Sequence, residues 1–271
     1  MIKLCFFDID GTLIPFGNNK IPASAKDALI KLNEKGIKTF VATGKSLSQM
    51  TKMDIMDIPF SGYLTLNGQL CYNEKMQMIF GYNIDPREME VLERIFLDDQ
   101  IPFSLIGEFS RYINFIDNEA IKHWKDTNSA LPDIGKYKGE KIYQITAFVT
   151  DREREVLEKT LDYCSITSWA PGAIDIYAKG GGKMNAIKHI LDQYNIKPEE
   201  CMAFGDAEND INMLKYCGIG VSLGNGTEAC KAAADYITTD INDDGVANAL
   251  KHFGLIWKTS NWKSYFLCES K

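Results

Sequence analysis

The sequence predicts an α/β fold in which a doubly wound parallel sheet is interrupted by a smaller α+β module. Short apolar runs alternate with amphipathic helical stretches over residues 1–82, and the alternation returns over residues 179–271. This pattern is typical of a parallel sheet with helices on both faces. Residues 83–178 instead contain runs of strands beside a few helices. We therefore expect a core domain built from both ends of the chain, with a second domain inserted into it.

The first segment contains three predicted strands of the parallel sheet, separated by helices. Apolar residues between Ala25 and Leu32 recur at helical spacing, and Gly36 follows as a stop. Asn67-Gly68 predicts a tight hairpin turn. The predicted strands cover residues 3–7, 37–43 and 62–68, the helices residues 22–36 and 47–56, and a hairpin residues 69–72 and 78–80.

The other two segments follow the same rules of periodicity and turn residues. In the inserted module, predicted helices cover residues 86–96, 118–127 and 152–161, and strands cover residues 102–106, 111–115, 142–149, 164–170 and 173–178. In the last segment, helices cover residues 184–194, 209–216, 227–234 and 245–253, and strands cover residues 201–206, 218–223 and 235–238. The tail, residues 255–271, is rich in aromatic residues, and we expect it to pack across the core rather than against a partner.

Composition and charge exclude several classes of protein. The net charge is −7 and no stretch concentrates lysine and arginine, so a nucleic-acid groove is not expected. No apolar run approaches the roughly 20 residues that span a bilayer, and the start of the chain does not resemble a secretory signal. The seven cysteines form no CxxC pair, which favours reduced thiols over disulfides or a zinc site. We expect a cytoplasmic protein that binds neither nucleic acid nor membrane.

Four groups of polar residues follow predicted strands or a glycine-rich stretch. They are Asp8 with Asp10, Thr43, Asp206 with Asp210, and Lys183 after the glycines of "KGGGK". Ligands of open parallel sheets bind at the carboxyl ends of the strands. A single sheet would therefore bring these groups, which are far apart in the sequence, to one edge.

The charges of these groups predict both a cation and an anionic ligand. Four carboxylates at one edge repel one another, and crowding raises the pKa of a carboxyl group so that one of them holds a proton. The remaining charge of −3 is then matched by Lys183 and one Mg²⁺, an ion that prefers oxygen ligands. A nearly neutral site accepts a phosphate group that it would otherwise repel.

The residue types suit phosphoryl transfer. Asp8 can attack phosphorus as a nucleophile, because carboxylates form aspartyl phosphates. Asp10 can protonate the leaving oxygen and later accept a proton from water. Gly11 lets the backbone approach the phosphate, and its N–H is expected to face the anion. Thr43 offers a hydroxyl group near a helix start, and Lys183 offers a fixed positive charge.

In order and spacing, four stretches of the chain resemble the four motifs of the haloacid dehalogenase-like superfamily: "DIDGTL", "ATGK", "KGGGK" and "GDAENDINML". The "NG" after the third predicted strand, and the later "VSLGNGTEACKAAADYIT" and "DDGVANAL", are similar to its Cof-type phosphatases, which carry a type-IIB cap. The resemblance covers the chain except for its tail. It implies a Rossmann-like core, an α/β cap, Mg²⁺, and hydrolysis of a small phosphate monoester, such as a sugar phosphate, through an aspartyl-phosphate intermediate.

The resemblance also assigns roles to residues. It implies a nucleophile at Asp8, the acid/base at Asp10 and phosphate contacts at Thr43 and Lys183. We also expect phosphate or substrate contacts from Gly11, Gly44, Lys45 and Asn209. The expected carboxylates of the metal site are Asp8, Asp10, Asp206 and Asp210, of which the resemblance implies Asp206 as a metal ligand and Asp210 as a support of the site. One departure is Lys45, which stands where the subfamily usually has arginine, so that the charge is kept and the bidentate fork is lost.

Substrate recognition is expected from the inserted module, because the four motifs all address the phosphoryl group. Trp169 offers an apolar face and Asp175 an acceptor for hydroxyl groups, although Trp169 also suits the core of the module and Asp175 a solvated strand. Two alternative functions stay open, a phosphomutase of the same fold and a catalytically silent binding module. A dehalogenase is disfavoured because it has no need of Asp10 as a leaving-group acid. The sequence names neither the substrate nor the oligomeric state.

Overall fold

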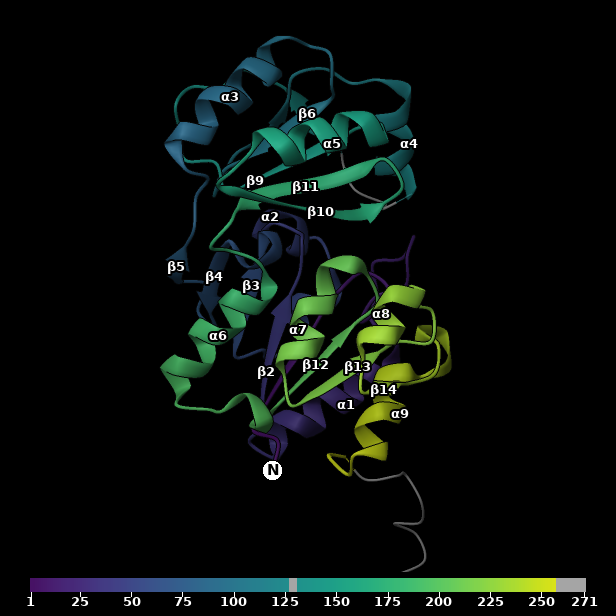
Figure 1. Ribbon diagram of the computed structural model, residues 1–271. Helices are drawn as coiled ribbons and strands as arrows, with labels where there is room; N and C mark the ends of the chain where they lie inside the picture. The colour runs from purple at the N-terminus through teal and green to yellow at the C-terminus, as the bar shows by residue number, and fades with distance from the viewer. Residues whose placement is uncertain (127–130, 257–271) are drawn as a thin grey trace, which may run out of the picture.

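The computed structural model describes residues 1–126 and 131–256, and the side chains of Asp126 and Trp169 also lie outside the described part. The chain forms two sheets, one above the other in Figure 1. We call the eight-stranded sheet and its helices the core, and the six-stranded sheet and its helices the cap. The predicted aromatic tail lies outside the described residues, apart from Leu255 and Ile256.

The core sheet has the strand order β14-β13-β12-β1-β2-β3-β4-β5. Its strands are β1 (Leu4–Phe7), β2 (Lys38–Ala42), β3 (Gly62–Thr65), β4 (Leu70–Asn73), β5 (Met78–Gly81), β12 (Cys201–Gly205), β13 (Ile219–Ser222) and β14 (Tyr236–Ile237). The strands from β14 to β3 run parallel, and β4 and β5 add antiparallel strands at one edge. The predicted hairpin is therefore confirmed, and β1 and β12 lie side by side near the middle of the sheet.

Helices cover both faces of the core sheet, as predicted. Alternate residues of β1 show the two faces, since Phe7 packs in one apolar cluster with Leu29, and Phe6 packs in another with Ile187. The first cluster includes residues of α1 (Ala23–Glu34) and α9 (Gly245–His252), and the second includes residues of α6 (Lys183–Tyr194), α7 (Ile211–Tyr216) and α8 (Glu228–Ala233). The doubly wound α/β core is confirmed.

The cap sheet has the strand order β10-β11-β9-β6-β7-β8, and all its pairs are antiparallel except β7 with β8. Helices α3 and α5 pack on the sheet through a cluster that includes Leu92, Leu157 and Ile145. The strands are β6 (Phe103–Ile106), β7 (Arg111–Ile113), β8 (Asp133–Ile134), β9 (Gln144–Phe148), β10 (Cys164–Ala170) and β11 (Ala173–Ala178), and the helices are α3 (Pro86–Leu97), α4 (Asn118–Asp126) and α5 (Asp151–Thr160). The other face of the sheet looks toward the core (Figure 1). The exact domain boundaries stay a prediction.

The predicted helix over residues 47–56 is wrong in its second half. Helix α2 covers only Leu47–Met50, and a 3-10 turn follows at Asp54–Asp57. The backbone is extended at Met53, with φ −115° and ψ 154°, and the Asp54 carboxylate accepts a hydrogen bond from the Ile21 N–H at 3.0 Å. This contact with a distant loop replaces the helical turn that the local sequence favours. The two-residue strand β8 was also not predicted, since it is too short to show a period.

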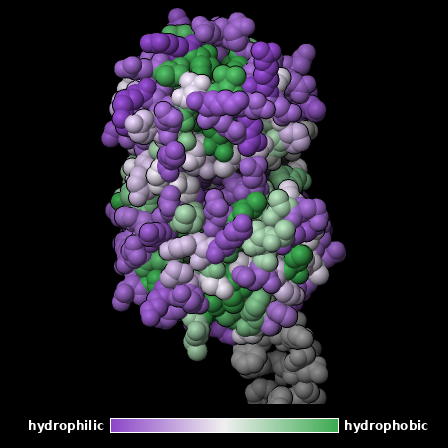
Figure 2. Space-filling view, viewed as in Figure 1, coloured by the Kyte–Doolittle hydropathy of each residue, from purple (hydrophilic) through white to green (hydrophobic). Residues whose placement is uncertain are grey.

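The six cysteines within the described residues are buried and free, as expected of thiols that fill a core. Among the described residues, no helix has the length and apolar character needed to cross a membrane. The face in Figure 2 is mostly hydrophilic, with apolar side chains in small separate patches over both sheets.

Candidate active site

Three carboxylates meet at the carboxyl edge of the core sheet. Asp8 follows β1 and Asp206 follows β12, and Asp210 ends the 3-10 turn Glu208–Asp210. All three are buried, and one oxygen of each lies within 4.8 Å of the others. Asp210 Oδ2 accepts from the backbone N–H groups of Asp206 and Ala207 at 3.0 and 3.1 Å, and Asp206 Oδ1 accepts from Thr12 Oγ1 at 2.8 Å. We call residues 206–210 the acidic loop.

Lys183 reaches this cluster from the first position of α6, and it is only 2% exposed. Its Nζ donates to Asp8 Oδ1 at 2.5 Å and to Asp210 Oδ1 at 2.7 Å. The preceding strand, β11, belongs to the cap sheet, so Lys183 arrives at the edge of the core sheet from a helix start rather than from a core strand. The predicted meeting of these four residues is found in the structure.

Burial and crowding shift the pKa values of the cluster. Burial raises the pKa of Asp8 to about 7, with Lys183 opposing the rise and Asp210 and Asp10 adding to it. Burial also raises the pKa of Asp206 well above its usual value. For Lys183, burial lowers the pKa, but the carboxylates of Asp210 and Asp8 outweigh it, so that the net shift is upward. These directions agree with the expectation that one crowded carboxyl group holds a proton.

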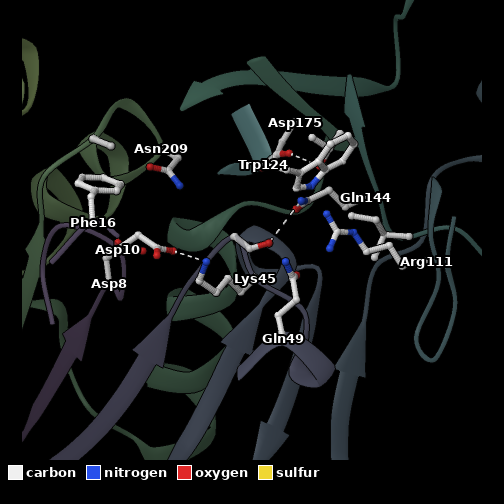
Figure 3. Close-up of a pocket in the computed structure, with 14 residues that line it drawn as sticks. Asp8, Asp10, Phe16, Lys45, Gln49, Arg111, Trp124, Gln144, Asp175 and Asn209 are labelled. Carbon is white, nitrogen blue, oxygen red and sulfur yellow. Dashed lines mark hydrogen bonds and ion pairs between the residues drawn. The ribbon is translucent and has the colours of Figure 1, made fainter. Parts of the chain in front are cut away.

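The cluster fits a hard divalent cation. With all its groups ionised, three carboxylates and one lysine leave a charge of −2, and carboxylate oxygens are ligands that such ions prefer. Asp10, which the sequence also placed among the metal ligands, lies outside this group of three. Its carboxylate instead forms an ion pair with Lys45, at 3.0 Å between Oδ2 and Nζ (Figure 3).

Gly11 allows the tight turn after Asp10. Its φ is +80°, and a Cβ atom at this position would collide with the Asp206 carboxylate, so a larger residue would displace a member of the cluster. The Gly11 N–H donates to the Ile14 carbonyl at 2.9 Å. In this structure that N–H is therefore engaged within the turn, and the expectation that it faces the anion is not met.

Residues Thr43–Lys45, which we call the β2 loop, lie at the same edge after β2. Thr43 is buried, and its Oγ1 accepts from the Lys45 N–H at 3.1 Å. Gly44 lies against the cap, because its carbonyl accepts from Gln144 Nε2 at 3.4 Å. The α2 helix that follows has only four residues, so its dipole adds little to anion binding.

A cavity of about 120 Å³ opens above these residues, between core and cap (Figure 3). Of the predicted site residues, the cavity is lined by Asp8, Asp10, Gly44, Lys45, Asp175 and Asn209. Phe16, Gln49 and Ala207 also line it from the core, and Ile106, Arg111, Trp124, Gln144 and Thr146 line it from the cap. Asp8 and Asp10 thus lie on the core side of the cavity, and a mixed apolar and polar wall that includes Asp175 lies on the cap side.

Arg111 supplies a positive charge to the cap wall and points into the cavity in Figure 3. Burial lowers its pKa to about 10, an effect that Asp175 opposes, so the guanidinium stays charged at neutral pH. The guanidinium carbon of Arg111, Cζ, lies 5.6 Å from the centroid of the Trp124 ring. A single sequence gives no sign of either residue's role, because their place depends on how the cap sits over the core.

Asp175 and Trp169 are the two cap residues that were predicted to contact the substrate, and the structure describes the side chain of Asp175 but not that of Trp169. Asp175, on β11, is buried, so a solvated strand position is excluded. Its Oδ2 accepts from Asn67 Nδ2 at 2.9 Å and its Oδ1 from Thr146 Oγ1 at 2.8 Å. The backbone of Trp169 lies in β10, beside a register shift between Ser168 and Ala170, but its side chain lies outside the described part of the chain.

Asn67 makes side-chain contacts that the sequence did not predict. Expected to be only a turn residue, it is 1% exposed, and its amide bonds to Asp175, to Gln144 Oε1 at 3.0 Å and to Asn209 Nδ2 at 3.0 Å. Its position directly after β3, a parallel neighbour of β2, was the available sign, since it places Asn67 at the same edge as Thr43.

Comparison with known proteins agrees with this geometry. The family model for haloacid dehalogenase-like hydrolases matches residues 5–250. A solved structure of BT1666 from Bacteroides thetaiotaomicron, described among phosphatases of this superfamily, is 29% identical with a TM-score of 0.87, over 94% of this chain and 96% of that one. The structure of BT4131, described as a subclass IIB sugar phosphatase, is 32% identical with a TM-score of 0.85, over 94% of this chain and 100% of that one.

A curated relative gives the same result from sequence. The 5-amino-6-(5-phospho-D-ribitylamino)uracil phosphatase YcsE of Bacillus subtilis is 28% identical over 263 residues, which are 94% of this chain and 96% of that protein. Fold, motifs and relatives therefore agree. The chain belongs to the haloacid dehalogenase-like hydrolases, and it is a phosphatase of the Cof type.

Proposed function

We propose that the protein hydrolyses a small phosphate monoester, with Mg²⁺ as its cofactor, through a phosphorylated Asp8. The observation that carries this proposal is the buried set of Asp8, Asp206 and Asp210 around Lys183, beside a cavity that Asp8 lines. Burying three carboxylates is costly unless a cation offsets them. Such a set suits a site that binds a cation and an anionic group together.

In the first step, an Asp8 oxygen attacks phosphorus and forms an O–P bond, while the bond from phosphorus to the ester oxygen breaks. The leaving oxygen keeps the electron pair and takes a proton from Asp10, which lines the same cavity. In the second step, water attacks the phosphorus of the phosphorylated Asp8 and gives its proton to Asp10. The Asp8–phosphorus bond then breaks, and inorganic phosphate leaves.

Other residues hold the phosphoryl group. Lys183 offers a buried ammonium beside Asp8, and Thr43 offers a hydroxyl group at the same edge. Gly44, Lys45 and Asn209 line the cavity and complete the proposed contacts. Lys45 also holds Asp10 by its ion pair, so it acts on the proton donor as well as on the anion.

Asp8 and Asp206 are the proposed direct ligands of the cation. Asp210 holds the acidic loop through the N–H groups of Asp206 and Ala207, and we assign it a supporting role. Mg²⁺, when bound, would offset the negative charge of the carboxylates and of the phosphoryl oxygens. Asp10 stays a prediction as a ligand, because its carboxylate is paired with Lys45 in this structure.

The substrate that the cavity supports best is a small polyhydroxylated phosphate ester, such as a sugar phosphate. Phe16 and Trp124 supply aromatic surface, and Gln49, Gln144 and Arg111 supply polar groups. Aromatic faces beside hydrogen-bonding groups suit a sugar ring, which has apolar faces and polar edges. BT4131 is described as a sugar phosphatase, which supports the same class of substrate.

The location of the protein in the cytoplasm stays a prediction.

A panel of about 100 phosphate esters, assayed with Mg²⁺ for phosphate release, tests the proposal. We expect kcat/KM to be highest for a few sugar phosphates and to be lost in Asp8→Asn. A phosphomutase would instead release little phosphate and would need a sugar bisphosphate activator. A silent binding module would release none from any ester, at any metal concentration.

A further inference from the structure

The turn between β3 and β4 has an unusual backbone. Leu66, Asn67 and Gly68 all have positive φ, at 50°, 54° and 83°. Asparagine and glycine accept this region, whereas leucine rarely does. Such a conformation persists only where surrounding contacts hold it, and it often marks a functional position. The contacts of this turn therefore indicate what it is for.

Asn67 lies where three parts of the site meet. Its backbone N–H donates to the Thr43 carbonyl at 2.8 Å, and the Leu66 N–H donates to the Lys45 carbonyl at 3.0 Å, so the turn bonds to both ends of the β2 loop. Its side-chain oxygen accepts from Asn209 in the acidic loop. Its Nδ2 donates to two cap residues, Asp175 and Gln144.

We propose that Asn67 is a positioning residue that couples closure of the cap to the β2 loop and the acidic loop, with Asp175 as the latch on the cap. The kinetic effects expected of this inference rest on the proposed function. The hydrogen bond between Asn67 and Asp175 does not, because it is a contact between the core and the cap. The cap is closed when Asp175 accepts from Asn67. Closure then fixes Asn67, and through Asn67 it fixes Asn209 and the acidic loop.

The chemistry of the amide explains why asparagine stands here. An amide offers two N–H donors and one carbonyl acceptor, and Asn67 uses both kinds of group, its Nδ2 toward the two cap residues and its Oδ1 toward Asn209. A carboxylate at this position would lose both donors and would face Asp175 with a like charge. A shorter side chain would not reach the cap.

Asp175 is equally well matched to a latch. Each of its oxygens accepts a hydrogen bond, Oδ2 from Asn67 of the core and Oδ1 from Thr146 of the cap. A buried carboxylate is costly without such donors. If the cap lifts, water must replace the Asn67 donor, so the hydrogen bond favours the closed arrangement. This role contrasts with the sequence-based expectation that Asp175 recognises substrate hydroxyl groups.

The test exchanges donor and acceptor across the contact. Asn67→Asp places two carboxylates face to face and should open the cap. Asp175→Asn keeps an acceptor for Asn67 and should cost much less than Asn67→Asp. In the double variant, the new amide at position 175 donates to the new carboxylate at position 67, while its oxygen still accepts from Thr146, so the contact is restored with the donor on the other side. Asn195→Asp is the matched control, because Asn195 shares the backbone conformation, with φ 52° and ψ 47°, but is exposed at the end of α6.

Two measurements are made on all four variants and on the wild type, in Mg²⁺. Small-angle scattering should show a larger radius of gyration for Asn67→Asp alone, with the double variant back at the wild-type value. Steady-state kinetics should show kcat/KM lowered about 10- to 100-fold in Asn67→Asp, the equivalent of one or two lost hydrogen bonds to a charged group, and largely recovered in the double variant.

The outcomes separate the latch from a merely structural turn. A turn that only supports the fold would be damaged by Asn67→Asp and would not be rescued by Asp175→Asn. A double variant as open and as slow as Asn67→Asp would overturn the proposal, and so would a wild-type radius of gyration in Asn67→Asp. If the wild type released phosphate from no ester, the proposed function would fail, while the scattering data would still decide the latch.

Discussion

Asp8 and Lys183 form a hydrogen bond of 2.5 Å between Oδ1 and Nζ, and both side chains are buried at the carboxyl edge of the core sheet. The contact joins residues 175 positions apart, one at the end of the central strand β1 and the other at the start of α6. It places a fixed positive charge beside the proposed nucleophile. It offsets only part of the negative charge of the three carboxylates, which leaves the cluster suited to a cation, and this arrangement underlies the following predictions.

Asp8→Asn should abolish turnover without unfolding the protein. The amide fills the same space and still accepts from Lys183, but it is no nucleophile, so kcat should fall at least ~1000-fold. Phosphate release is the measurement, with circular dichroism as the control for folding. Near wild-type release by a folded Asp8→Asn protein would eliminate Asp8 as the nucleophile.

Removal of the metal should stop the reaction, and Mg²⁺ should restore it. Ca²⁺ should inhibit, because it takes about 6–8 oxygens in a loose geometry whereas Mg²⁺ enforces an octahedron. A second Asp8 oxygen drawn to Ca²⁺ would no longer be aligned for attack. The assay compares phosphate release in excess chelator, after addition of Mg²⁺, and after addition of Ca²⁺. Full activity in chelator would refute the metal requirement.

The stabilisation by Mg²⁺ should depend on pH. The Asp8 carboxyl has a pKa of about 7 in the folded, metal-free protein against an ordinary value of 3.8. Between these values the folded protein holds a proton that the unfolded chain has lost, so a rise in pH across this window lowers the free energy of unfolding. Mg²⁺ must displace that proton at low pH but not above pH 7. The increase in Tm caused by Mg²⁺ should therefore be larger at pH 8 than at pH 5.5.

Asp8→Asn provides the control for this pH dependence, since its amide does not titrate. The difference in Mg²⁺ stabilisation between pH 5.5 and pH 8 should shrink in this variant. An equal increase in Tm at both pH values in the wild type would show that protons do not compete with the cation at Asp8.

Lys45 should act through its ion pair with Asp10. Lys45→Met removes the charge that holds the Asp10 carboxylate and should lower kcat/KM about 10- to 100-fold, the scale of one charged hydrogen bond. Lys45→Arg restores the charge and adds the bidentate fork, and it should keep most of the activity. Kinetics on one sugar phosphate compare the three proteins. Equal losses in the two variants would show that the shape of lysine, rather than its charge, matters here.

The sequence was sufficient to predict most of the core, because its strands are short runs of apolar residues and charged side chains follow their carboxyl ends. Asp8 and Asp206 could be placed together because β1 and β12 are parallel neighbours. The cap contacts could not be derived in this way. Alternation along β9 and β11 shows which residues share a face, but not that Gln144 and Asp175 meet Asn67. The Asn67-Gly68 pair has the local pattern of a simple turn, and the partners of its amide, in the cap and in the acidic loop, follow only from tertiary packing.

Asp175→Ala distinguishes the latch from a role in reading hydroxyl groups. As a latch, Asp175 is needed whenever the cap closes, so kcat/KM should fall by a similar factor, within about threefold, for a hexose phosphate and for a small aryl phosphate. As a ligand of hydroxyl groups, it would be needed only for the hexose phosphate, and the aryl phosphate would be hydrolysed nearly as before. Thr146→Val is the matched comparison, because it removes the other donor to the carboxylate and leaves the contact between Asp175 and Asn67 in place. We expect Thr146→Val to lose less activity than Asp175→Ala on both substrates. A loss confined to the hexose phosphate would return Asp175 to the specificity site that the sequence predicted.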